Sequence, residues 1–458
     1  MKKGISVVVL LFLAGCSQKH IQRKSKKTVA GLNAQLHSTY HTQVAWDQQF
    51  IHPDEPLSLE RAITMAMQNN AQLQADLEML GIANADLMQA QLFSNPELAT
   101  AFEIPKQSSR SEDTRLKTDV DIELAWKLSD LWQVPLRKRV AEDELEIISL
   151  RVLQNILDIY AETKIVYSDI VYQKALYVNA QAAYAQAKEL NKQIKYRYNF
   201  GYNTEQEIYL SNADVKKAKI ELTQAQRRLD EAYVRIRELL YLPISTDPIA
   251  LTQDLFIPAQ LPSQKQVGQL MLKNRPEIHI AQMHIEQATH KIKLERAKVF
   301  DDVQIGLSYA RKPDGRIRRG PLFGLSLPVF DLNQAQISRA KTVREKRKKE
   351  LISTKHMLLK KVLLIYQEVE TKIKNIARRK QILDTYQKAI DFDLSYAQNM
   401  QISWIHAMQN QLAYYEQRKL LLTLLMETSK NLAELERSIG TSLNIKFNLK
   451  KLPIDKLI

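Results

Sequence analysis

Apolar and polar residues along the chain follow two different periods, one typical of helices and one typical of strands. Residues 57–93 form a helix-like segment, and two segments near 98–104 and 119–128 then alternate between apolar and polar residues, which predicts β-strands. Residues 136–200 and 202–242 follow without a glycine or a proline. In the first of these stretches apolar residues recur at a spacing of three and four, so both are interpreted as long helices.

The second half of the chain repeats the first at a distance of 205 residues. The segment "AMQNNAQLQADLEMLGIANADLMQAQLFSNPEL", residues 66–98, aligns without a gap with "MLKNRPEIHIAQMHIEQATHKIKLERAKVFDDV", residues 271–303. In this alignment Asn69 falls on Asn274. The identity is low, but the elements that follow come in the same order, which indicates an internal duplication.

The repeated elements predict a mainly α-helical fold with a small β part. Alternating segments lie near 303–310 and 322–330, with a polar loop at 311–320 between them, and residues 333–439 again lack glycine and proline. We therefore expect two tandem repeats, each made of long antiparallel helices plus a β-hairpin. The shorter helices of a repeat together match the long one in length, so we expect them to lie end to end beside it.

This pattern also suggests a division of the chain. We expect a signal peptide at 1–15, a lipidated N-terminal segment at 16–56, a first repeat at 57–242, a linker at 243–263, a second repeat at 264–440 and a tail at 441–458.

The N-terminal segment carries the three-part pattern of a secretory signal. Lys2 and Lys3 precede an apolar run of ten residues, 5–14, which is too short for a spanning helix of about 20 residues. The run ends in Leu-Ala-Gly-Cys, which resembles the lipobox of bacterial lipoproteins, and Cys16 is the only cysteine of the chain. We expect Cys16 to carry acyl chains such as palmitate, which anchor the chain to a membrane. The alternative is an uncleaved anchor with an incidental cysteine.

Charge and motifs narrow the classes of function. The formal net charge of +15 raises nucleic acid as a partner, but a lipid-anchored envelope protein makes that partner unsuitable, so none is expected. No phosphate-binding loop and no His-Glu-x-x-His motif is present, and His279, His284 and His290 are spaced by five and six residues, poorly for one helix face. We expect no enzyme, no cofactor and no metal site.

The four predicted strands need partners if they enter a membrane. An open sheet leaves backbone N–H and C=O groups unsatisfied in hydrocarbon, and the smallest closed barrels have about eight strands. A chain with four strands must then oligomerise, and three copies supply twelve. The alternative places the hairpins in a sheet surrounded by water.

Several short segments resemble the TolC-like outer-membrane efflux proteins, in the same order along the chain. These segments are "LSLERA" at 57–62, "NPEL" at 95–98, "YNFG" at 198–201, "NRPEI" at 274–278 and "GLSLPVFD" at 324–331. The resemblance implies a homotrimer whose twelve-stranded outer-membrane barrel continues as a helical barrel through the periplasm. It further implies a passive exit duct that works with a periplasmic adaptor protein and an inner-membrane pump, in contact with outer-membrane lipid.

The same resemblance assigns roles to residues near two helical turns. The residues expected to contact the adaptor are Tyr198, Asn199, Phe200, Gly201, Tyr202, Asn203 and Thr204 in the first turn, with Asn399, Met400 and Gln401 in the second. Gln401 stands where the first turn has Gly201, which leaves the role of the second turn open. The possible periplasmic gate comprises Asp384, Asp391, Asp393, Glu205 and Glu207, and the alternative is that each is an ordinary surface charge.

The sequence leaves the cargo open. "NPEL" at 95–98 and the basic triplet at 137–139 look like the heavy-metal branch of the resembled family, while drugs and detergents are the other small-molecule candidates. One alternative function is a type I secretion exit duct for polypeptides. A second is a lipid-anchored coiled-coil scaffold without a pore, although a scaffold has no use for four amphipathic strands at repeated positions.

Overall fold

The computed structural model describes residues 56–104, 118–252, 256–312, 314–398, 404–443 and 451–453. The chain divides into two compact units. The first contains Leu77–Arg151 and Glu277–Thr354, and the second contains Val152–Pro276 and Lys355–Ile458 together with Val29–Asp76. Each unit draws on both halves of the chain, so the two sequence repeats do not form separate globular domains.

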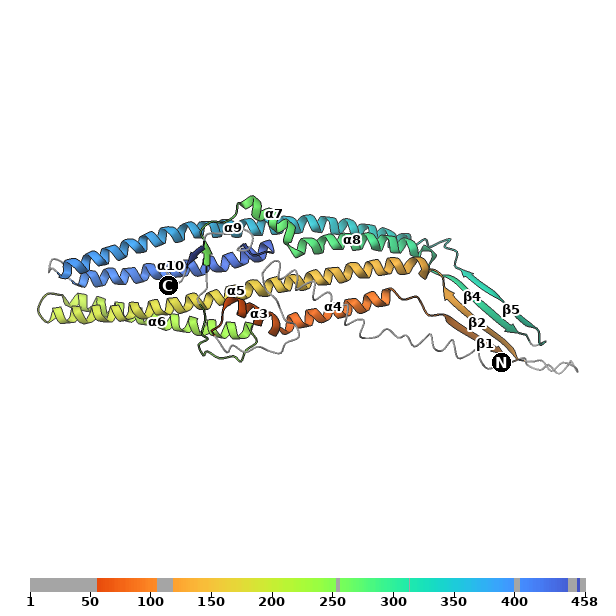
Figure 1. Ribbon diagram of the computed structural model, residues 1–458, viewed down its shortest axis with the longest axis horizontal. Coiled ribbons are helices and arrows are strands. Elements are labelled where there is room, and N and C mark those ends of the chain that lie inside the picture. The colour runs from red at the N-terminus through yellow and green to blue at the C-terminus, as the bar shows by residue number, and fades with distance from the viewer. Residues whose placement is uncertain are drawn as a thin grey trace. The chain divides into compact units, whose positions relative to one another are not determined.

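The first unit contains an antiparallel sheet of four strands (Figure 1). Its strands are β1 (Glu97–Glu103), β2 (Asp119–Lys127), β4 (Val303–Arg311) and β5 (Ile317–Leu325), in the order β1-β2-β4-β5. The hairpin of the first repeat, β1 and β2, pairs with the hairpin of the second, β4 and β5, through β2 and β4, where Leu124 lies opposite Leu307. The sheet therefore combines the two repeats.

The helices of the first unit all join the sheet at one end. The elements are the C-terminal part of α4 (Ala71–Ala90), the first part of α5 (Asp130–Tyr198), most of α8 (Pro276–Ala297) with a 3₁₀ turn (Lys298–Phe300), and the first part of α9 (Gln334–Gln398). They precede β1 and β4 and follow β2 and β5, so the hairpin connections lie at the opposite end of the sheet.

Polar contacts fasten the two repeats at the junction of sheet and helices. The Ser129 hydroxyl donates to the Asp301 carbonyl at 2.5 Å, and the Gln133 amide donates to the Asp301 carboxylate at 2.8 Å.

The buried Asp130 carboxylate, at the start of α5, has two partners within the first repeat. It accepts the Ser94 N–H at 2.5 Å and pairs with the Arg137 guanidinium at 3.0 Å. Burial favours the neutral acid, but these two partners hold the pKa of the Asp130 carboxyl below its usual value.

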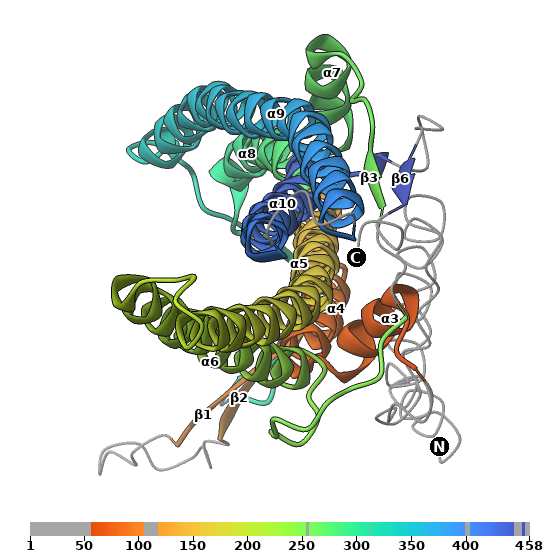
Figure 2. The same cartoon turned by 90° about the vertical axis from the view of Figure 1, so that its left-hand side faces the viewer.

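The second unit is built from long helices and one two-stranded sheet. Its elements are α3 (Leu59–Asn69), the rest of α5, α6 (Glu205–Leu239), α7 (Gln264–Asn274), the rest of α9, α10 (Trp404–Ile439), β3 (Phe256–Pro258) and β6 (Lys451–Pro453). In Figure 2, as in Figure 1, this part of α5 lies between α6 and α10. Its core includes Ile156, Tyr167 and Tyr172 of α5 and Leu422 of α10. The Tyr167 hydroxyl donates to the Leu57 carbonyl at 2.9 Å, which ties the start of the first repeat to the core.

Two helix breaks depart from the expected continuous segments. Residues 57–93 form α3 and α4 rather than one helix, because Asn70 is extended and its side chain caps α4 by accepting the Leu73 N–H at 2.8 Å. The second repeat breaks at Arg275, which precedes Pro276 at the first position of α8. The two breaks are 205 residues apart, the distance found in the sequence.

The fourth strand lies earlier than predicted. It was expected at 322–330 and occupies 317–325, because the backbones of Lys312 and Arg316 bond to each other and so set the pairing of Arg311 with Ile317. The Lys312 N–H donates to the Arg316 carbonyl at 2.9 Å, and Gly315 adopts a φ of +84°. Of the expected polar loop at 311–320, residue 311 and residues 317–320 are therefore strand. The pair β3 and β6, which joins the linker to the tail, was not predicted.

None of the described helices contains an apolar stretch long enough to cross a membrane.

Candidate functional site

One face of the four-stranded sheet is apolar and exposed. Successive strand residues point to opposite faces, and the register places most large apolar residues of the four strands on the same face, while Leu322 lies on the other. Its members are Leu98 and Phe102 of β1, Val120, Ile122, Leu124 and Trp126 of β2, Val303, Ile305, Leu307 and Tyr309 of β4, and Ile317, Pro321, Phe323 and Leu325 of β5. Val303, at the end next to the helices, is buried. Phe102 is 66% exposed and Leu307 is 59% exposed. Water-soluble monomers rarely expose a contiguous apolar area of this kind, so the face is suited to lipid or to another apolar partner.

The opposite face of the sheet is polar, and its β1 and β2 part is acidic. Glu103, Asp119, Asp121 and Glu123 share this face with small or polar residues of β4, among them Gly306 and Ser308. Lys312 lies at its edge, with its ammonium nitrogen 3.0 Å from an Asp119 carboxylate oxygen and 3.5 Å from one of Asp121. The sheet therefore separates an apolar surface from a surface that attracts cations.

The turn between α5 and α6 has a defined backbone structure. The Tyr202 N–H donates to the Arg197 carbonyl at 3.0 Å, and the Gly201 N–H donates to the Tyr198 carbonyl at 2.9 Å, which is the Schellman pattern at a helix C-terminus. Gly201 has a φ of +74°, where a residue with a Cβ is strained. The location of Gly201 in this turn agrees with the sequence prediction.

A capping box starts the next helix. The Thr204 hydroxyl accepts the Glu207 N–H at 3.3 Å, and the Glu207 carboxylate accepts the Thr204 N–H at 2.7 Å. These hydrogen bonds, together with one from the Asn203 amide, hold the pKa of the Glu207 carboxyl below its usual value. Glu207 is thus engaged in the turn, although its side chain remains exposed.

Exposed aromatic side chains cover this turn. The rings of Tyr196 and Phe200 are 4.9 Å apart, and the Arg197 guanidinium lies 5.5 Å from the centre of the Tyr202 ring. Tyr198 and Phe200 are exposed, and Tyr202 is 74% exposed. Aromatic and arginine side chains dominate the binding energy of many protein interfaces, so the turn has the composition of a docking surface.

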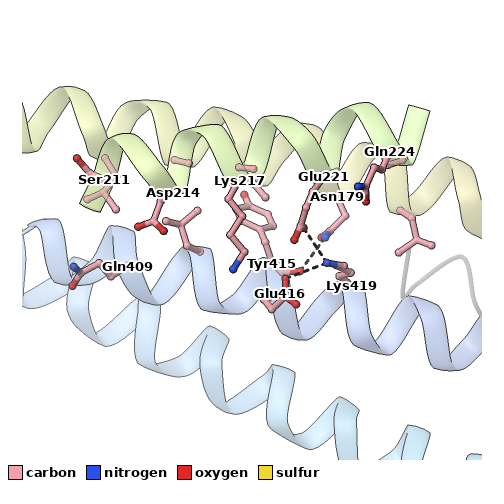
Figure 3. Close-up of a pocket in the computed structure, with 18 of the residues that line it drawn as sticks. Asn179, Ser211, Asp214, Lys217, Glu221, Gln224, Gln409, Tyr415, Glu416 and Lys419 are labelled. Carbon is pink, nitrogen blue, oxygen red and sulfur yellow. Dashed lines mark hydrogen bonds and ion pairs between the residues drawn. The ribbon is translucent and has the colours of Figure 1, made fainter. Parts of the chain in front are cut away.

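A groove of about 610 Å³ lies between α5, α6 and α10 in the second unit (Figure 3). Its apolar wall comes from α5 and includes Ala183, Ala187 and Leu190, whereas α6 and α10 contribute charged groups. The Lys419 ammonium lies 2.9 Å from the Glu221 carboxylate and 3.6 Å from that of Glu416. The sequence reasoning missed this groove. The signal available was the polar stripe at helical spacing on α6, formed by Asp214, Lys217, Glu221 and Arg228.

The predicted gate residues have different environments. Asp393 is buried, and its carboxylate accepts the Asn410 amide at 2.5 Å and lies 3.4 Å from the His406 ring nitrogen, so it joins α9 to α10. Asp384 and Asp391 are exposed on α9, and the Asp391 carboxylate accepts the Gln387 amide at 3.0 Å. Glu205 is exposed and accepts the Tyr209 hydroxyl at 2.6 Å.

Some predicted residues fall outside the described part of the chain. These are Cys16 at the expected lipidation site and Asn399, Met400 and Gln401 in the second turn.

The three histidines of α8 have separate surroundings. The His290 ring lies 2.6 Å from the Asp143 carboxylate, while burial and the nearby guanidinium groups of Arg347 and Arg151 lower the pKa of His284. Within the described residues, no group of three or more His, Cys, Asp and Glu side chains could hold a metal ion.

The chain resembles one curated protein in sequence and several solved structures in fold. No protein-family model matches the chain. The cobalt-zinc-cadmium resistance protein CzcC of Cupriavidus metallidurans is 24% identical over 319 residues, which cover 68% of this chain and 72% of CzcC. The solved structure of CusC, described for its transmembrane channel formation, superposes with a TM-score of 0.66 at 15% identity over 84% of this chain and 92% of CusC. The chain has the TolC-like fold.

Two further structures with the TolC-like fold give similar agreement. The outer membrane protein VceC of Vibrio cholerae superposes with a TM-score of 0.64 at 16% identity, over 84% of this chain and 96% of VceC. The open state of the MtrE outer membrane channel of Neisseria gonorrhoeae gives 0.61 at 18% identity, over 84% of this chain and 89% of MtrE. The fold expected from the sequence, mainly helical with a small sheet and a TolC-like arrangement, is confirmed.

Proposed function

We propose that the chain is the outer-membrane channel of a tripartite efflux pump, a passive exit duct for substrates delivered from the inner membrane. The observation that carries the proposal is the sheet whose apolar face is exposed and whose opposite face is polar and acidic. Such a sheet suits a boundary between lipid and a water-filled lumen. The TolC-like fold supports the same interpretation, since several chains that share it are outer-membrane channels by name.

The edges of the sheet explain why several copies are needed. β1 and β5 each pair with one strand among the described residues, so their outer edges present free backbone groups. Because the sheet is antiparallel with an even number of strands, β5 of one copy lies antiparallel to β1 of the next when the sheet closes into a barrel. Three copies supply twelve strands, enough to close a barrel and satisfy these groups. The functional unit is therefore a homotrimer with its helices in the periplasm.

Partners follow from the surfaces outside the barrel. The aromatic α5–α6 turn is the contact for a periplasmic adaptor protein, which links the duct to the inner-membrane pump, and 399–401 of the second turn contribute to the same contact. Cys16 carries the lipid that fastens the N-terminal segment to the outer membrane. The better gate candidates are the exposed Asp384, Asp391 and Glu205. Asp393 already binds α10, and Glu207 already caps the start of α6.

Divalent metal ions are the first cargo to test. The relative CzcC is named for cobalt, zinc and cadmium resistance, and Asp121 and Glu123 give the polar face a charge that suits cations. Organic drugs remain the second class of cargo. Growth of a strain that lacks the chain, on graded cobalt, zinc and cadmium and on an organic cation, separates the two classes. Sensitivity to the organic cation alone would overturn the metal assignment and leave the duct intact.

The duct itself is tested by conductance of the purified protein in a planar bilayer, with chemical crosslinking to count subunits. We expect stable conductance steps and a crosslinked trimer. The matched control is a variant in which Asp121 and Glu123 become Asn and Gln, which should conduct with reduced preference for cations. A monomeric protein without conductance would refute the duct and favour a lipid-anchored scaffold. Conductance that requires an unfolded polypeptide substrate would favour the secretion duct.

A further inference from the structure

Two arginines stand at the end of the apolar face that lies farthest from the helices. Arg311 ends β4 on the face that carries Leu307 and Tyr309, and Arg319 of β5 pairs directly with Tyr309 on the same face. Arg311 pairs with Ile317, so the two arginines are diagonal neighbours, which lie about 7–8 Å apart in ordinary sheet geometry, with their Cβ atoms somewhat closer. Both side chains are exposed. An apolar surface therefore ends in two adjacent cations.

Two other cations at this end of the sheet are paired with carboxylates, whereas Arg318, on the polar face, has no such partner among the described residues. Lys312 pairs with Asp119 and Asp121, and Arg316 pairs with Asp314 at 3.3 Å. Among the described residues, Arg311 and Arg319 have no such carboxylate partner, whereas the acidic side chains of β2 lie on the other face of the sheet. As far as the described residues go, their charges are thus available to an anion from outside the chain.

The position along the strand indicates which kind of anion fits. A nine-residue strand at about 3.3 Å per residue spans roughly 30 Å, so Leu307 lies at the middle of β4 and Arg311 about 13 Å beyond it. Because strands in a membrane barrel tilt by about 35–45°, this distance corresponds to roughly 10 Å along the membrane normal, and a long arginine side chain can extend the remaining few ångströms to the headgroup level, where tyrosine is also enriched. An anion bound there has an apolar surface directly beneath it.

We propose that Arg311 and Arg319 together bind the phosphate of an outer-leaflet lipid, whose acyl chains lie along Leu307 and Tyr309. The proposal rests on the proposed function, because it requires the sheet to stand in the outer membrane. Arginine suits this ligand because its planar guanidinium donates two hydrogen bonds to one phosphate. Free phosphate uses the charges alone, whereas a lipid also covers the exposed apolar side chains below them.

The test compares lipid binding by the full-length protein in neutral detergent. The probes are lipid A, which carries phosphate monoesters, lipid A from which the phosphates have been removed, and phosphatidylcholine. The variants are R311A/R319A and, as the matched control, R318A. Arg318 is adjacent to Arg319 in the same strand and equally cationic, but it points to the polar face. Retained lipid per protomer is measured after gel filtration, and apparent affinity by titration.

We expect the wild type to prefer phosphorylated lipid A over both other lipids, and a large excess of inorganic phosphate to displace little of it. A basic residue at a membrane surface contributes about 1 kcal/mol, which is a factor of about five, so R311A/R319A should lose about 25-fold in affinity. R318A should bind as the wild type does.

A loss of about fivefold in R318A, which is the same loss per removed charge as in R311A/R319A, would overturn the proposal, since diffuse charge then accounts for the binding. Equal binding by the wild type and R311A/R319A, in protein that still conducts in a phosphatidylcholine bilayer, would overturn the lipid site and leave the duct standing. Displacement of the lipid by free phosphate would refute the apolar part of the site. Wild-type protein that neither inserts nor conducts would remove the proposed function and this inference together.

Discussion

Replacing Leu307 tests most directly whether the apolar face of the sheet lies in a membrane. It lies at the middle of β4 on the apolar face, and the adjacent Ser308 points to the polar face. Leu307 is 59% exposed in a single copy, so its replacement removes little packing within that copy. If lipid covers it, the lost apolar burial costs about 1–2 kcal/mol, and an arginine at the membrane centre costs about 2–4 kcal/mol more for each copy.

We therefore expect L307R to reduce insertion at least tenfold, because the cost is incurred in all three copies of a trimer. The assay is the fraction of protein that resists urea extraction from outer membranes, together with the frequency of conductance steps in a planar bilayer. S308R, which introduces the same charge one residue away, should insert as the wild type does and change only the ion preference. If the sheet stood in water, L307R would fold and behave as the wild type does, because an exposed leucine there can be replaced by arginine at almost no cost. Normal insertion of L307R, or equal loss in S308R, would refute the assignment of the faces.

Three further predictions concern the turn, the junction and the lipid anchor. G201A should destabilise the α5–α6 turn by about 1–2 kcal/mol, because a residue with a Cβ is strained at this positive φ; a Cβ there would meet no atom within 4 Å, so backbone strain is the whole cost. Faster amide exchange at 199–204 with weaker adaptor binding is the expected result, and unchanged exchange would contradict it. The lowered pKa of the Asp130 carboxyl contributes stability that is present above its unfolded value of 3.8 and is lost as the pH falls through the lower folded value. The free energy of unfolding from urea denaturation should therefore fall less between pH 5 and pH 3 in D130N than in the wild type. An equal fall in both proteins would refute this role. C16A should abolish incorporation of labelled palmitate without abolishing conductance of the purified protein, whereas continued labelling would exclude Cys16 as the attachment site.

The sequence predicted the elements of this fold well where local periodicity reports them. β1, β2 and β4 lie within one residue of their predicted bounds, and α6 lies within the stretch 202–242. The helix α5 fills most of the stretch 136–200 but begins earlier, at Asp130, with Pro135 inside its first turns. β5 was misplaced, because Arg318 and Arg319 interrupt its alternation and the apolar residues after Leu325 continue it. The hydrogen bond between the backbones of Lys312 and Arg316, rather than the apolar pattern, set its register.

The candidate site was predicted in part. Gly201 marked the α5–α6 turn correctly, since positive φ restricts the choice of residue there. The surroundings of the acidic residues could not be predicted, because the contact of Asp393 with Asn410 depends on how α9 packs against α10. The groove beside Lys419 likewise requires three helices to meet.

The sequence by itself determined the kinds of element, their order, their duplication and the two-faced character of the strands. These properties follow from side-chain period, which is fixed by backbone geometry within a few residues. Only the tertiary structure decided that β2 pairs with β4 and so places the hairpins of both repeats in one sheet, with Leu124 opposite Leu307. It also decided that Arg311 and Arg319 stand together at the end of the apolar face. Such pairings join residues far apart in the chain, and a local period contains no information about which distant strand completes the hydrogen bonds.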